Sequence, residues 1–109
     1  MQRVTLVRYT TKPGRTVENE ALTRAVFAEL RGQKPDELAY AVFKGRDGVS
    51  FVHLFVNLAA DDSDALTELP AFKKFQAGVA ERCEAKPEVI RLALDLIDVY
   101  GLTPVPAEA

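Results

Sequence analysis

Side chains able to do chemistry gather in one short stretch, residues 48–58, with the sequence GVSFVHLFVNL. His53 is the only histidine of the chain, and Phe51, Phe55 and Asn57 lie two or four residues from it. Side chains of a strand alternate between its faces, so a strand would place all four on one side. An imidazole exchanges protons near neutral pH, since its unperturbed pKa is about 6.5, and an amide can orient a carbonyl or hydroxyl group. We therefore expect a site here, with His53 and Asn57 as catalytic residues and Phe51 and Phe55 as apolar walls.

These aromatic and polar residues also have a structural interpretation. A lone histidine is more often hydrogen-bonded in a core or a subunit interface than catalytic. Aromatic side chains at strand and helix spacing are what a core requires. This applies to Phe51, Phe55, Phe72 and Phe75.

The remaining candidate ligands do not predict a metal site. Cys83 is the only cysteine, so it has no partner for a disulfide or a thiolate cluster, and we expect a buried, inert thiol. Asp61, Asp62 and Asp64 resemble carboxylate ligands, but a helix start accounts for them and their spacing is not that of a calcium loop.

The composition is that of one globular domain. The chain has 109 residues, 48% hydrophobic and 28% charged, with a formal net charge of −2. That balance argues against nucleic-acid binding and against anionic membranes, both of which use basic surfaces. No run approaches the ~18 apolar residues of a membrane helix, and residues 1–10 lack a signal-peptide core. We expect a cytoplasmic domain over residues 1–101, a flexible tail over 102–109, and a small molecule or a protein as partner.

Four stretches show the pattern of strands and two that of helices. Alternating stretches are residues 3–9, 38–44, 48–58 and 88–100, whereas helical spacing runs from Thr16, the expected N-cap, to Gly32 and over residues 71–84. Residues 45–48, Gly-Arg-Asp-Gly, predict a hairpin. The order β-α-β-β-α-β predicts a ferredoxin-like α+β fold, in which two helices cover one face of a four-stranded antiparallel sheet.

The other face of this sheet needs a cover. Residues 48–58 and 88–100 are apolar on both sides, but two helices cover only one side. We therefore expect a homodimer packed sheet to sheet. In the second helix, Lys73, Lys74, Glu81 and Arg82 are expected mainly on the solvent side. Gly78 in its interior indicates that something packs closely there.

One family with this order of elements is the RNA-recognition motif. Residues 47–54 resemble its aromatic octamer at Gly48, Phe51 and Val52. However, Val49 stands where a stacking aromatic is required, Asp47 replaces the leading basic residue, and residues 3–9 have Thr5 at the companion aromatic position. RNA-recognition motifs bind RNA through exposed aromatic side chains that stack on bases and through basic residues. Because this sequence lacks both at the required positions, we do not expect RNA binding.

A second resemblance covers nearly the whole chain, and it is to the antibiotic biosynthesis monooxygenase family of dimeric α+β barrels. In that family a third-strand motif of the form F-V-L-Y-E-V-W is followed by an acidic Ala-Leu turn and by a helix with the motif H-F-x-x-F. The counterparts here are residues 51–57, Asp64-Ala65-Leu66 and residues 71–75, preceded by Val7-Arg8-Tyr9 and Lys12-Pro13-Gly14. The resemblance implies a dimer whose two sheets form a barrel, with a small pocket in each subunit between sheet and helices.

The resemblance does not extend to heme degradation. Heme-degrading members use an asparagine in the first strand, a tryptophan at the end of the third and a histidine at the second helix. Here the aligned positions hold Val7, Asn57 and a region near Leu69 without histidine, and the chain has no tryptophan. His53 lies on a different element from the family's iron ligand. We expect no cofactor.

Cofactor-independent members of the family oxidise electron-rich phenols to quinones, and the deprotonated substrate itself activates oxygen. This chemistry requires a dry pocket, a base and a hydrogen bond that orients the ring. The resemblance implies that His53 is the base, that Asn57 orients the ring, that Arg91 holds a phenolate, and that Phe51, Phe55, Phe72 and Phe75 line the pocket. The family's glutamate and tryptophan are replaced here by Phe55 and Asn57. The alternative is a non-catalytic dimeric barrel that binds a ligand or serves as a structural partner.

Overall fold

The computed structural model describes residues 2–36, 38–59, 65–98 and 100. The tail over 102–109 and the aspartates Asp61, Asp62 and Asp64 lie outside these residues, so their predictions stay untested. The elements are β1 (Gln2–Thr10), α1 (Thr16–Gln33), β2 (Leu38–Lys44), β3 (Ser50–Asn57), α2 (Ala65–Glu68), α3 (Pro70–Ala77), α4 (Val79–Arg82) and β4 (Glu88–Leu94).

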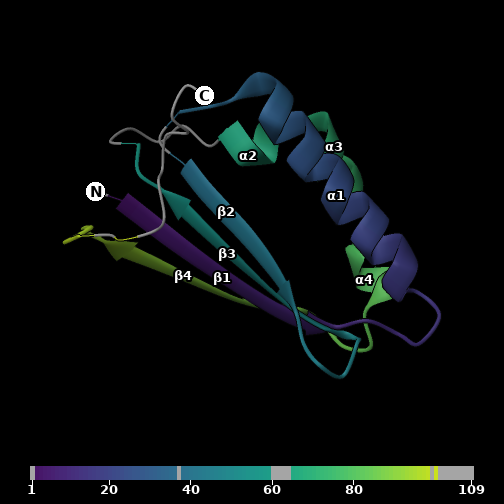
Figure 1. Ribbon diagram of the computed structural model, residues 1–109. Helices are drawn as coiled ribbons and strands as arrows, with labels where there is room; N and C mark the ends of the chain where they lie inside the picture. Colours follow the sequence, from purple (N-terminus) through teal and green to yellow (C-terminus); the bar gives the residue numbers. More distant parts are fainter. Residues whose placement is uncertain (1, 37, 60–64, 99, 101–109) are drawn as a thin grey trace.

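The sheet has the order β2-β3-β1-β4, and each neighbouring pair is antiparallel. Figure 1 shows the helices together on one side of this sheet. The α+β, ferredoxin-like fold expected from the sequence is therefore confirmed. The predicted hairpin is present, because β2 and β3 pair across residues 45–48 and Gly48 has a φ of 81°, which favours glycine.

The strand register decides which side chains face the helices. Val7 lies opposite His53 on β3 and Val89 on β4, and Thr5 lies opposite Phe55 and Arg91. Directly paired residues share a face of the sheet. We call this side, which carries the odd-numbered residues of β1, β3 and β4 and the even-numbered residues of β2, the inner face. The core between the inner face and the helices contains Tyr9, Val26, Phe51, Leu66, Leu69, Phe72, Phe75 and Cys83.

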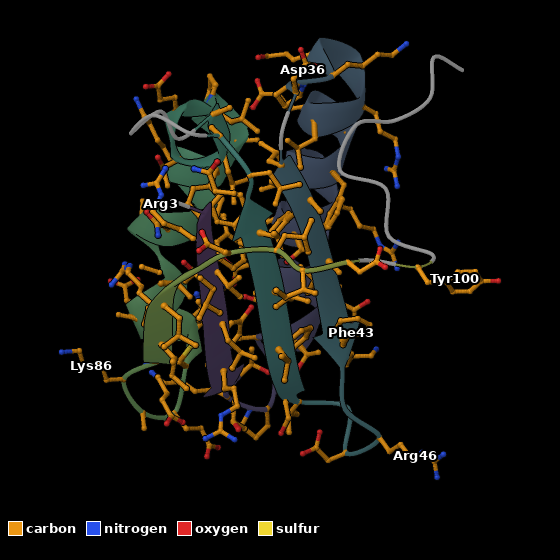
Figure 2. The ribbon with its side chains drawn as sticks, turned by 90° about the vertical axis from the view of Figure 1, so that its left-hand side faces the viewer. Arg3, Asp36, Phe43, Arg46, Lys86 and Tyr100 are labelled. Carbon is orange, nitrogen blue, oxygen red and sulfur yellow. The ribbon has the colours of Figure 1, made fainter. Side chains whose placement is uncertain are left out.

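The opposite side, the outer face, is apolar, and no helix that the structure describes covers it. Leu6 pairs with Leu54 and Ile90 across its centre. Large apolar side chains are exposed around these residues: Phe43, Ile90, Leu92 and Leu94. Figure 2 looks onto this side, with the helices behind the sheet and the chain beyond β4 crossing in front on its way to Tyr100. The expectation of a second apolar face is therefore confirmed, whereas its occupant stays a prediction.

Three predicted boundaries, two of the first helix and one of the last strand, were wrong. The N-cap residue is Arg15, and the hydroxyl of Thr16 is instead 2.8 Å from that of Thr11. α1 continues through Gly32 and is ended by Lys34, whose left-handed backbone lets its N–H donate to the carbonyl of Leu30. β4 ends at Leu94, which pairs with Gln2 of β1, and does not continue to residue 100.

The second helix differs most from the prediction. The expected single helix over 71–84 is α3 and α4, separated at Gly78, and Arg82 is 1% exposed instead of facing solvent. The prediction of close packing at Gly78 is confirmed, since a Cβ there would lie 3.1 Å from Nη1 of Arg82. Glycine therefore leaves room for the guanidinium group.

Substituting Gly78 tests this close approach. Gly78 has a φ of −117°, which alanine also adopts, so a loss of stability in Gly78→Ala would come from the contact with Arg82. Arg82 is held by two hydrogen bonds and cannot easily move aside. We expect Gly78→Ala to lower the free energy of unfolding by about 1 kcal/mol in urea denaturation.

Gly32→Ala is the matched control, because a Cβ at Gly32 meets nothing within 4 Å. It is expected to stabilise the protein by about 0.5 kcal/mol through helix propensity and reduced unfolded-state entropy. Equal effects of the two substitutions would show that the contact with Arg82 is unimportant.

Candidate functional site

A cavity of about 280 Å³ lies between the inner face and the helices α2, α3 and α4. Its walls are mainly apolar and aromatic, and they include Phe55, Phe72 and Phe75. Tyr9, Tyr40 and His53 are among its polar lining residues. Small-molecule sites commonly combine an apolar enclosure with a few placed polar groups, and this cavity has that character.

His53 is held between two tyrosine hydroxyls. Its Nε2 is 2.7 Å from the hydroxyl of Tyr9, and its Nδ1 is 2.7 Å from the hydroxyl of Tyr40. The residue is 5% exposed. The three side chains come from β3, β1 and β2, so the pairing of three neighbouring strands assembles this arrangement.

The hydrogen bonds continue from Tyr9 into the helices. Nδ2 of Asn19, on α1, donates to the hydroxyl of Tyr9 at 2.9 Å. Arg82, at the end of α4, donates from Nε to Oδ1 of Asn19 and from Nη2 to the carbonyl of Phe75, both at 2.9 Å. Its guanidinium carbon also lies 4.8 Å from the centre of the Phe75 ring. We call the residues Arg82, Asn19, Tyr9, His53 and Tyr40 the hydrogen-bonded chain.

Burial keeps the ionisable members next to the cavity uncharged near neutral pH. Desolvation lowers the pKa of His53 to about 4 and raises the pKa of Tyr9 to about 12. The pKa of Tyr40 is also raised, mainly by desolvation. Because His53 is neutral and both its nitrogens are engaged, it is a weaker base than its unperturbed pKa would indicate.

Most of the predicted site residues surround this cavity. His53, Phe55, Phe72, Phe75 and Arg91 all line it. The strand face that carries His53 and Phe55 is therefore the one that faces the helices and the cavity. Whether these residues act on a ligand stays a prediction.

Phe51 and Asn57 occupy other surroundings. Phe51 is buried and stacks on Tyr9, with ring centres 5.5 Å apart, so it supports the tyrosine from behind. Asn57 is buried at the end of β3, where its Oδ1 accepts a hydrogen bond from the backbone N–H of Ala59. It lines an adjoining hollow of about 300 Å³, which shares Thr5, Phe55 and Arg91 with the main cavity.

Sequence reasoning missed four members of the hydrogen-bonded chain. The alternation of β1 and β2 placed Tyr9 and Tyr40 on definite strand faces, but nothing showed that these faces coincide with that of His53. Asn19 is polar and buried on α1, and Arg82 follows Gly78 by four residues. A glycine one helical turn before an arginine was the only signal in the sequence for a buried guanidinium group.

The described residues offer no evident metal or heme site. They contain no cluster of three or more histidine, cysteine, aspartate or glutamate side chains that could hold an ion. A heme iron at His53 would have to displace a tyrosine hydroxyl from one of the ring nitrogens. Among the helices that the structure describes, none is long and apolar enough to cross a membrane.

Comparisons with known proteins identify the fold. The sequence matches no protein-family model and no curated protein. Among solved structures, Rv0793 from Mycobacterium tuberculosis is 21% identical, with a TM-score of 0.72 over 90% of this chain and 100% of its own. A structure named antibiotic biosynthesis monooxygenase is 20% identical, with a TM-score of 0.66 over 88% of this chain and 100% of that one.

A third similar structure is a variant of SnoaB from Streptomyces nogalater, described as a cofactor-independent oxygenase. It is 16% identical, with a TM-score of 0.63 over 87% of this chain and 94% of its own. The resemblance found in the sequence is therefore confirmed at the level of the fold.

Proposed function

We propose that the protein is a cofactor-independent monooxygenase that oxidises a small, electron-rich phenol in the cavity between its sheet and helices. The observation that carries the proposal is the aromatic cavity of about 280 Å³, into which a hydrogen-bonded histidine and two tyrosines project. The similarity to SnoaB, which is described as a cofactor-independent oxygenase, supports the reaction class.

The proposed reaction balances without an added reductant. The phenolate ring supplies the electrons that reduce oxygen, and a new C–O bond forms at the ring carbon para to the hydroxyl group. The O–O bond breaks, one oxygen atom stays in the quinone, and the other leaves as water with the phenolic and ring hydrogens. The aromatic walls of the cavity would hold the ring in place and limit its contact with water.

Residue roles follow from the positions of the side chains. Tyr40 and Arg91 line the cavity and are placed to contact a substrate oxygen. His53 is a positioning residue in this proposal, because it acts through the tyrosine hydroxyls that occupy both of its nitrogens. Asn57 would contact only a substrate long enough to enter the adjoining hollow.

Oxygen uptake with phenols and hydroxynaphthalenes that carry a hydrogen on the ring carbon para to the hydroxyl group tests the function. The native protein is expected to consume oxygen and, with ¹⁸O₂, to place one labelled atom in the quinone. Tyr40→Phe and His53→Ala are expected to lower kcat/KM by roughly tenfold to a hundredfold, the range for loss of a hydrogen-bond donor at a developing charge. Lys73→Ala, at an exposed position of α3, should match the native protein. Rates for His53→Ala equal to the native rate would remove His53 from the mechanism.

The second candidate is a barrel that binds an aromatic ligand without reacting with it. It is favoured by the engagement of both nitrogens of His53 and by the lowered pKa of that residue, which together leave no ready base. If the native protein binds the tested phenols but consumes no oxygen with any of them, the result would support the ligand-binding barrel.

We further propose that two copies pair through their outer faces. The exposed apolar residues Phe43, Ile90, Leu92 and Leu94 support this assembly. Beyond β4, Leu96 and Ile97 are also exposed. Both figures place the chain after β4 on the side of the sheet away from the helices, where it would meet a second copy.

A further inference from the structure

The direction of the hydrogen-bonded chain is fixed at its Arg82 end. A guanidinium group has only N–H donors, so the atom of Asn19 that it contacts at 2.9 Å must be the amide oxygen. The amide nitrogen of Asn19 therefore points to the hydroxyl of Tyr9, 2.9 Å away, and donates to it. Arg82 thus removes the usual ambiguity about which way an asparagine amide is turned.

The same reasoning fixes the proton on Tyr9. The amide nitrogen of Asn19 is a donor and cannot accept the hydroxyl hydrogen of Tyr9. The remaining partner of this hydroxyl is Nε2 of His53 at 2.7 Å, so Tyr9 donates to His53. Nε2 is then the unprotonated nitrogen of a neutral imidazole, which agrees with the lowered pKa of His53.

The hydrogen-bonded chain ends at the cavity with the hydroxyl hydrogen of Tyr40. A neutral His53 that accepts at Nε2 carries its proton on Nδ1 and donates it to the oxygen of Tyr40 at 2.7 Å. That hydrogen bond leaves the hydroxyl hydrogen of Tyr40 without an acceptor among the described residues. Tyr40 is half-buried and lines the cavity, so a ligand oxygen is the natural partner.

We propose that the cavity recognises its ligand through a hydrogen-bond acceptor, a phenolate or quinone carbonyl oxygen, which Tyr40 contacts as the donor. Arg82, Asn19, Tyr9 and His53 are positioning residues that set the direction of this donation. The inference rests on the proposed function, because it names the ligand group that the same cavity takes.

The charges around the cavity favour the same kind of ligand. Lys86 and Arg91 line it, and no carboxylate does among the lining residues that the structure describes. Tyr9 and His53, the other titratable groups that face Tyr40 and the ligand, are neutral near pH 7 because of their burial. A phenolate would therefore meet a donor and two cations.

One substitution, Asn19→Asp, should reverse the direction of donation along the hydrogen-bonded chain. In Asn19→Asp, one carboxylate oxygen still accepts from Arg82, while the other accepts from Tyr9 in place of the donating amide. Tyr9 would then accept from Nε2–H of His53, Nδ1 would accept from Tyr40, and Tyr40 would present lone pairs to the cavity. The variant is expected to bind a neutral phenol in preference to a phenolate.

Nitrogen-15 NMR of the protein labelled at histidine reads the direction without any ligand, because His53 is the only histidine. The native protein is expected to carry its imidazole proton on Nδ1, and Asn19→Asp on Nε2. Far-UV circular dichroism would confirm that both are folded. A native protein with the proton on Nε2, or an unchanged proton position in Asn19→Asp, would overturn the proposed direction.

Binding of 4-nitrophenol, whose phenolate absorbs visible light, tests the ligand class. The native protein is expected to lower the pKa of the bound phenol, and Tyr40→Phe to bind the phenolate about tenfold to a hundredfold more weakly, as for a lost hydrogen bond to a charged group. Arg91→Gln should weaken phenolate binding but leave the proton of His53 on Nδ1. Preference of the native protein for the neutral phenol would overturn the inference. Phenolate binding without oxygen uptake by any substrate would instead refute only the proposed function.

Discussion

Arg82→Ala is expected to lower the free energy of unfolding by about 3 to 5 kcal/mol, measured by urea denaturation. The substitution leaves Oδ1 of Asn19 and the carbonyl of Phe75 without their donor in the interior. Each such buried group costs about 1 to 3 kcal/mol, and the packing of the guanidinium group on the Phe75 ring is lost as well. The effect is large because Arg82 joins α4 to both α1 and α3.

Arg24→Ala is the matched control for Arg82. The Arg24 side chain is 81% exposed and makes one ion pair with Glu20, so its removal should change stability by less than about 0.5 kcal/mol. Arg82→Lys should lower the free energy of unfolding by an intermediate amount. An ammonium group keeps the charge but lacks the planar guanidinium geometry that donates to both Asn19 and Phe75. A loss below 1 kcal/mol in Arg82→Ala would show that water or a neighbouring group replaces the guanidinium group.

Leu54→Lys is expected to convert the proposed dimer into monomers. Leu54 lies at the centre of the outer face, opposite Leu6 on β1 and Ala41 on β2. A symmetric interface would bury the added charge twice, and each buried unpaired charge costs several kcal/mol. The dissociation constant should therefore rise by roughly three orders of magnitude or more in analytical ultracentrifugation.

Val17→Lys controls for the added charge, because Val17 is exposed on α1, on the other side of the sheet. It should leave the dissociation constant unchanged. Leu92→Lys, at a more exposed position of the outer face, gives a second test in case Leu54→Lys folds poorly. A native protein that is monomeric at micromolar concentration, or a dimer unaffected by both outer-face substitutions, would contradict the proposed interface.

The fold could be predicted largely from periodicity. Alternation in β1, β2 and β3 and the turn at residues 45–48 depend on neighbouring residues, so a single sequence carries them. The ends of α1 and β4 were missed because they depend on other parts of the chain. Lys34 adopts a left-handed backbone conformation that is unusual for lysine, and β4 ends where its partner β1 begins.

The site could be predicted only in part, because it depends on register and on contacts between distant elements. The position of His53 on an alternating strand was enough to assign it to the face with Phe55. Its partners Tyr9 and Tyr40 lie 44 and 13 residues away, and the relative shift of the strands decides whether their hydroxyls meet it. Arg82 was assigned to the solvent side because it lies outside the apolar stripe of the predicted helix. In the structure, amide, carbonyl and aromatic groups hold the buried guanidinium group.

The two sides of β3 also differ in what they allow evolution to change. His53 and its odd-numbered neighbours lie on the inner face, while Leu54 and its even-numbered neighbours lie on the outer face. Point mutations can therefore alter the proposed ligand site and the proposed dimer interface separately. Insertion or deletion of one residue within β3 would exchange the two sets and disturb both properties at once. Homologues should consequently vary in residue type along this strand while keeping its length.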